Sequence, residues 1–82
     1  MILDAMKKHT KDVKVQKNGC GALMSLALND DNQKTIANEG GIKVILNAMK
    51  EHAKDVKVQE NGCGALRNLA ENNDNQKTIA KE

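Results

Sequence analysis

Residues 54–66 read KDVKVQENGCGAL and residues 11–23 read KDVKVQKNGCGAL, so one stretch occurs twice with a single change. The match extends over the whole chain at an offset of 43 residues: residues 1–39 align with residues 44–82, and 29 of the 39 pairs are identical. Self-similarity with a period of about 20 to 50 residues indicates a solenoid, in which each unit buries its apolar face against a neighbour. We therefore expect two repeat units, residues 1–39 and residues 40–82.

Three helices and no sheet are predicted within one period. The apolar residues after the glycine pair Gly40–Gly41 have the i, i+3, i+4, i+7 spacing of a half-buried helix; they are Ile42, Ile45, Leu46 and Met49. A short helix over residues 33–39, capped by Asp31 or Asn32, should end at Gly40. Six helices follow for the whole chain, with breaks near Asp12, Asp31, Gly40, Asp55 and Asp74.

The longest predicted helix runs from about residue 56 to residue 71, with Asp55 as its N-cap. Its sequence divides into two faces. One face holds Val56, Gln59, Cys63, Leu66 and Ala70, and the other holds Val58, Gly62, Ala65 and Leu69. Two such faces are typical of a helix packed between neighbours, so we expect both to be buried, with Leu66 and its counterpart Leu23 in the core.

Composition favours a small soluble protein and excludes several classes of partner. The 82 residues include 13 basic and 11 acidic side chains, and no aromatic residue or proline. Nearly balanced charge and the lack of a stacking platform argue against nucleic acid. No apolar run approaches the roughly 20 residues that span a membrane, and no signal peptide follows Met1. We expect a cytoplasmic protein with a thin core that oligomerisation supplements.

The side chains that could bind a metal ion or take part in catalysis do not form a predicted site. Cys20 and Cys63 recur once per unit, as His9 and His52 do, but their spacing is not that of zinc ligands. Stacked helices also lie too far apart for a Cys20–Cys63 disulfide, so both thiols are expected to be reduced and buried. GCG lies within a helix and follows no strand, which rules out a phosphate loop. We predict no enzyme activity, no metal and no cofactor.

The order of these elements resembles an armadillo repeat. Residues 32–72 present a short first helix, a Gly-Gly turn, a second helix and a long third helix that ends in ALRNLA. The resemblance covers essentially the whole chain, in the permuted order second, third and first helix. It implies an all-α fold, an armadillo-type α-solenoid that forms a right-handed superhelix, and a role in protein–protein interaction.

The resemblance also implies where a peptide would bind. In armadillo proteins the third helices line a concave groove, and the asparagine of ALRNLA, here Asn68, holds the backbone of an extended peptide. Ser25 takes that place in the first unit, so the row of one asparagine per repeat is interrupted. Nuclear-import receptors carry a tryptophan four residues earlier, where this chain has glycine, so binding of nuclear signals is disfavoured. The candidate groove residues are Asn68, Arg67, Gly64, Glu71, Ser25, Met24 and Gly21.

Differences between the units suggest a second kind of contact. Met24 and Leu28 are apolar where Arg67 and Glu71 are charged, and four-residue spacing places them on one helical face. That pair is either neutral drift or a partner contact.

A solenoid usually needs three or more units, so we expect this two-unit chain to close its open ends in a homo-dimer or tetramer. The candidate self-association residues are Ile2, Leu3, Met6, Leu28 and Ile79. The close identity of the units suggests an excised or engineered fragment. The alternative function is therefore that of an engineered or ancestral-type model repeat protein that does nothing beyond folding.

Overall fold

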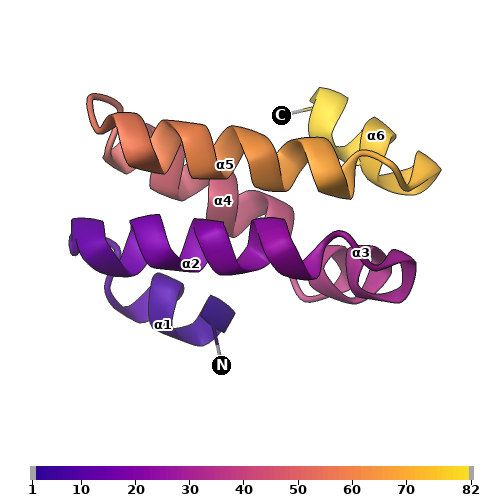
Figure 1. Ribbon diagram of the computed structural model, residues 1–82, viewed down its shortest axis with the longest axis horizontal. Helices are drawn as coiled ribbons and strands as arrows, with labels where there is room; N and C mark the ends of the chain where they lie inside the picture. The colour runs from indigo at the N-terminus through magenta and orange to yellow at the C-terminus, as the bar shows by residue number, and fades with distance from the viewer. Residues whose placement is uncertain (1, 82) are drawn as a thin grey trace.

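The computed structural model describes residues 2–81, and over that range it consists of six α-helices joined by turns (Figure 1). The helices are α1 (Ile2–Lys8), α2 (Val13–Leu26), α3 (Asp30–Asn38), α4 (Gly41–Glu51), α5 (Val56–Leu69) and α6 (Asn73–Lys81). The bounds of α2 and α5 differ by the 43-residue offset, and so do those of α3 and α6. The predicted all-α fold of six helices is confirmed.

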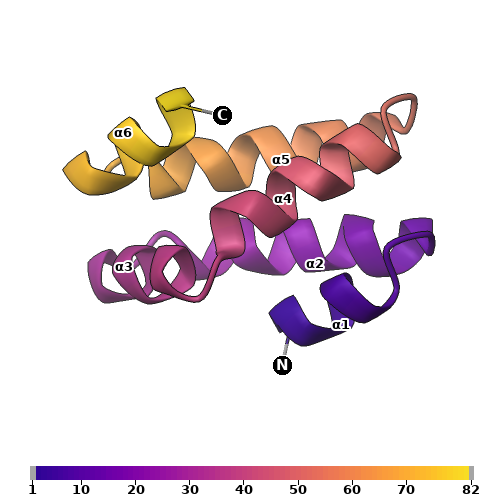
Figure 2. The same ribbon diagram turned by 180° about the vertical axis from the view of Figure 1, so that it is seen from behind.

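The long helices α2 and α5 lie side by side and form the centre of the molecule (Figure 1). Seen from behind, α4 crosses diagonally over this pair, and α1 packs against both α2 and α4 (Figure 2). The short helix α3 contacts α2, α4, α5 and α6. One continuous core fills the space between these helices, and its best-buried large side chains are Met6, Leu23, Ile45, Val58 and Leu69.

Side-chain caps begin the long helices where the sequence predicts them. The Oδ1 atom of Asp12 accepts a hydrogen bond from the backbone nitrogen of Val15 at 3.1 Å, and Asp55 accepts from Val58 at 3.0 Å. The break at Gly40 is also confirmed, because this residue has φ of +84° between α3 and α4. Such a left-handed conformation suits glycine, which has no Cβ to clash with the backbone.

The predicted caps of the short helices are wrong by two or three residues. Asn29, and not Asp31 or Asn32, caps α3, accepting from the backbone nitrogen of Asn32 at 3.0 Å. In the second unit Asn72 does the same for Asn75 at 3.1 Å, so the break lies before Asp74. Each helix gains a turn with carboxylates near its positive end, which the helix dipole favours.

Glutamine side chains form hydrogen bonds across the turns between the second and third helices. The Nε2 atom of Gln16 donates to the carbonyl oxygens of Met6 (3.1 Å) and His9 (2.8 Å), and Gln59 donates to Met49 (2.8 Å) and His52 (3.1 Å) in the same way. These carbonyls lie at the C-terminal ends of α1 and α4, where intrahelical donors run out. The carbonyls of His9 and His52 also accept from the backbone nitrogens of Asp12 and Asp55 at 3.0 Å. The glutamines therefore fix each second helix against the third helix of its own unit.

Candidate interaction surfaces

The contact between the two repeat units is the largest in the chain and shows how a third unit would pack. On α2 the buried residues include Gln16, Cys20 and Leu23, and just beyond the helix end Ala27 is buried as well. On α5 the buried residues are Val58, Gly62, Ala65 and Leu69. The units therefore meet through different faces of equivalent helices, as successive repeats do in a solenoid.

The same residues are more exposed wherever no unit covers them. Leu69 is fully buried, whereas its counterpart Leu26 is 42% exposed. Cys20 is fully buried, whereas Cys63 is exposed. Since these residues are identical in type and the bounds of α2 and α5 correspond, the differences in exposure report the neighbouring unit. The prediction that both faces of residues 56–71 are buried is wrong for α5: Val56 is 67% exposed and Leu66 is only half-buried.

Two surfaces follow from this comparison. We define the head face as Ala5, Val15, Ala22 and Leu26, four residues of the first unit that are more exposed than their buried counterparts in the second. We define the tail face as Gln59, Cys63, Leu66 and Ala70, four residues of the second unit that are more exposed than their buried counterparts in the first. Every one of these residues is identical to its counterpart.

Asparagine hydrogen bonds across the internal interface run in one direction. The Nδ2 atom of Asn61 donates to the carbonyl oxygen of Lys17 at 2.9 Å, and Asn68 donates to that of Met24 at 2.7 Å. Farther along, Asn75 donates to Gln33 at 3.1 Å. These asparagine donors come from the second unit, and the acceptors are backbone carbonyls of the first.

A ring nitrogen and an ion pair add to the same interface. The Nε2 atom of His52 lies 2.8 Å from the carbonyl oxygen of Thr10. The Nζ atom of Lys11 lies 3.3 Å from the carboxylate of Glu51, with both side chains largely in solvent. Contacts to backbone carbonyls fix the relative position of the units without depending on the side chain of the accepting residue.

A cavity of about 330 Å³ adjoins the head face. Its walls come from α1, α2 and α3, and the lining residues include Ile2, Leu26 and Ile36. One period along the chain the equivalent space lies between α4, α5 and α6, and α3 packs against all three of these helices. The cavity thus lies on the part of the first unit that corresponds to the α3 contact in the second unit.

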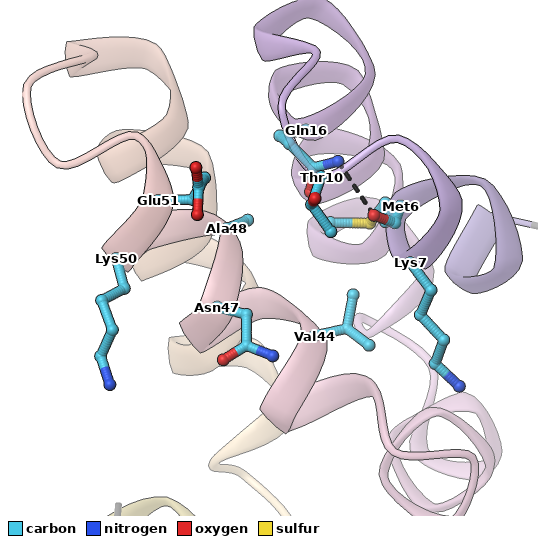
Figure 3. Close-up of a pocket in the computed structure, with 9 residues that line it drawn as sticks. All are labelled: Met6, Lys7, Thr10, Gln16, Val44, Asn47, Ala48, Lys50 and Glu51. Atoms are coloured by element: carbon cyan, nitrogen blue, oxygen red, sulfur yellow. Dashed lines mark hydrogen bonds between the residues drawn. The ribbon is translucent and has the colours of Figure 1, made fainter.

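A second cavity, of about 350 Å³, lies between α1 and α4 and is drawn in Figure 3. Its floor is apolar, with Met6, Val44 and Ala48 all buried. The side chains of Lys7 and Lys50 diverge (Figure 3). Because its charged groups do not converge on one point, this cavity is the seam between the second helices and has no feature of a ligand site.

The structure commits the amide nitrogen of Asn68 to the contact between units, through its hydrogen bond to Met24. Met24 itself packs over Gly64, where an added Cβ would collide with its Sδ atom. Gly21 lies beside the amide of Asn61 in a similar way. The remaining groove candidates lie at the surface: Ser25, Arg67 and Glu71 are exposed.

Several expectations about exposure are corrected. Leu3 and Met6 are buried within the chain, since α2 and α4 pack on α1. Met24 and Leu28 do not share a helical face, because α2 ends at Leu26 and Leu28 follows it, 72% exposed. Of the candidate self-association residues, Ile2 and Ile79 are half-buried.

The two thiols differ although their sequence positions are equivalent. Cys20 is buried as predicted, and burial raises the pKa of its thiol to about 11 because the thiolate is poorly solvated there. Cys63 is exposed, so the prediction of a buried thiol is wrong in the second unit. Among the described residues no group of three or more His, Cys, Asp or Glu side chains is placed to hold a metal ion.

Sequence reasoning missed Asn61 and Asn75 as contact residues. Asn61 and Asn68 are seven residues apart on α5, which places both amides on one side of the helix, and this spacing was the available signal. Asn75 had no comparable signal, because its role depends on α3 and α6 lying side by side. None of the described helices is long and apolar enough to cross a membrane.

Comparison with known proteins identifies the repeat. The armadillo/β-catenin-like repeat family matches residues 29–71, a segment that comprises α3, α4 and α5 and includes the second unit's third helix. No curated protein and no solved structure matches the chain. Armadillo repeats are generally non-enzymatic and bind proteins. With more than half of its length matched and an all-helical structure of two stacked units, the chain belongs to the armadillo repeat family and is an α-solenoid.

Proposed function

We propose that this chain is a protein-interaction module whose head and tail faces bind further copies of itself. The observation that carries the proposal is the difference in exposure between equivalent residues, such as Leu26 and Leu69. Each end presents apolar side chains that the neighbouring unit buries elsewhere in the same chain. Removing apolar surface from water contributes about 25 cal/mol per Å², so covering both ends favours association.

The other finer prediction is an extended peptide held across the third helices α2 and α5. Exposed polar side chains at Ser25, Arg67 and Glu71 support it. However, one N–H of the Asn68 amide already donates to the carbonyl oxygen of Met24, 2.7 Å away, which leaves a peptide the second N–H and the side-chain oxygen. Because Asn68 is partly committed in this way and Ser25 replaces it in the first unit, we favour self-association over peptide binding.

The rival proposal is an engineered or ancestral-type repeat protein with no role beyond folding. Its support is the identity of 29 of 39 paired residues, which makes both units behave as internal repeats. It differs from self-association in what it expects of the open ends, since a protein that only folds has no need to cover them.

Light scattering coupled to size-exclusion chromatography, over a wide range of loading concentrations, tests the proposal. We expect the mean mass to exceed that of the 8.9 kDa chain and to rise with concentration. A helical chain that keeps the monomer mass at every concentration would exclude self-association and support the rival. Circular dichroism at 222 nm on the same fractions separates a folded monomer from an unfolded one.

A further inference from the structure

We propose that copies of this chain associate head to tail, with the tail face of one copy on the head face of the next in the register of the internal interface. The inference rests on the proposed self-association and adds the direction of the association, the contacts that form and the contacts that are lost. The occupant of the head face is α6 together with the tail face of a second copy. The template is the contact between the two units of a single chain.

The direction follows from where donors and acceptors lie. In the internal interface the asparagine donors come from the following unit, and their acceptors are backbone carbonyls of the preceding one. By the 43-residue offset, Asn18 and Asn32 of one copy are the donors of the head face. The carbonyls of Glu60 and Gln76 in another copy are their acceptors. Two head faces would place these asparagine donors opposite each other, whereas the head-to-tail arrangement pairs them with carbonyl acceptors.

The cavity at the head face fits the same occupant. It is the counterpart of the seat that α3 fills, and α6 carries the sequence of α3 with changes only at Asp30 and Asn38, which become Asn73 and Lys81. Ile36 is buried in its seat, whereas Ile79, its counterpart on α6, is half-buried. Docking of α6 in the head cavity of a second copy would cover Ile79, although a second copy has no counterpart of Gly41, against which Ile36 packs.

The junction is a weakened version of the internal interface. Ser25 stands where Asn68 stands in the second unit, so the contact equivalent to the 2.7 Å hydrogen bond between Asn68 and Met24 is missing. The pair Lys11–Glu51 becomes Lys54 opposite Lys8, two like charges. These substitutions lower the affinity of the junction and leave its apolar centre unchanged.

Blocked variants test the direction. L26K alters the exposed centre of the head face, and C63K alters the exposed centre of the tail face. Each variant alone should be a folded monomer, because it keeps only one working end. An equimolar mixture should form a heterodimer that grows no further, since the tail of L26K meets the head of C63K.

Cys63 reports this contact directly. In L26K the exposed thiol of Cys63 should react with a thiol reagent at once, while Cys20 stays protected by burial. Excess C63K, which lacks that thiol, should slow the reaction in proportion to the bound fraction. If C63K dimerised alone the contact would be head to head, and if L26K dimerised alone it would be tail to tail. Either result overturns the inference while self-association stands.

Gain-of-affinity variants test the register. S25N should tighten association about fivefold, the equivalent of one net hydrogen bond. K8E should tighten it about two- to fivefold at low salt, and less as salt screens the pair. K14E is the charge-matched control, because Lys14 and its counterpart Lys57 are both exposed and belong to neither face.

Three outcomes distinguish the head-to-tail register from self-association in general. A continuous rise in mass, with S25N above wild type and K14E equal to it, supports the head-to-tail register. Association that S25N and K8E leave unchanged overturns the register alone. A wild-type chain and an L26K/C63K mixture that both remain monomeric overturn self-association itself.

Discussion

At the scale of single residues, Leu23 and Leu66 show that environment, not residue type, decides burial. Both leucines occupy the same position in equivalent helices, yet Leu23 is 2% exposed and Leu66 is half-buried. The neighbouring unit covers the first, whereas the second packs against the core on one side only and keeps the rest of its surface in solvent. A sequence pattern reports which face of a helix is apolar, but it does not report whether anything packs on that face.

This pair gives a matched stability test. Leu23→Ala should lower the free energy of unfolding by about 2–5 kcal/mol, because it leaves a cavity in the core. Leu66→Ala should lower it by about 1 kcal/mol in dilute solution. Urea unfolding followed by circular dichroism measures both, since the chain has no aromatic probe. Equal losses at low concentration would show that the tail face is covered within the monomer.

At the scale of elements, the sequence predicts the helices better than their ends. All six helices were predicted from apolar spacing, caps and the repeat; the cap Asp55 and the break near Asp12 were identified correctly. The start of α3 was not, because residues 29–32 read NDDN and every one of them is able to cap a helix. The choice of Asn29 goes with hydrogen bonds across the turn between α2 and α3, such as that from Gln33 to the carbonyl oxygen of Ala27 at 2.9 Å.

The candidate site was less predictable than the fold. The apolar residues of both faces were recognised, but the amides of Asn61 and Asn75 were not, because their acceptors are carbonyls 42 to 44 residues away. Contacts of this kind depend on how the units stack. The periodicity of apolar residues along one helix carries no information about this stacking.

The turn between α3 and α4 provides a test at this scale. Gly41→Ala would place a Cβ 2.7 Å from the carbonyl oxygen of Ile36, a backbone atom that cannot move aside without shifting the turn. Gly40→Ala meets no atom within 4 Å and suffers only from φ of +84°, a cost of about 1–2 kcal/mol.

We therefore expect Gly41→Ala to lower the free energy of unfolding more than Gly40→Ala, as urea unfolding would measure. The reverse order would mean that backbone conformation, and not close packing of α3 on α4, limits this turn.

At the scale of the whole molecule, the chain behaves as two units of a one-dimensional stack. The stability of such a stack is the sum of terms for its units and terms for the interfaces between neighbours. Two units share a single interface, so a large part of the potential interface area stays in solvent. This uncovered interface area lies at the two ends of the stack, in the exposed tail face and in the cavity at the head face.

Linking two copies covalently tests this additivity without relying on concentration. The joint within the chain is Gly40, Gly41, Ile42 and Lys43, and Ile42 is buried. A tandem protein in which the same four residues connect two copies doubles the units but triples the interfaces, from one to three. Its free energy of unfolding should therefore exceed twice that of the single chain, with a higher urea midpoint at equal chain concentration. Replacing the joint by Gly-Ser-Gly-Ser keeps the length and removes the buried isoleucine, so that control should recover only part of the gain. If the tandem protein unfolded at the midpoint of the single chain, the head and tail faces would have no affinity for each other even when held together, and the stacking model would fail.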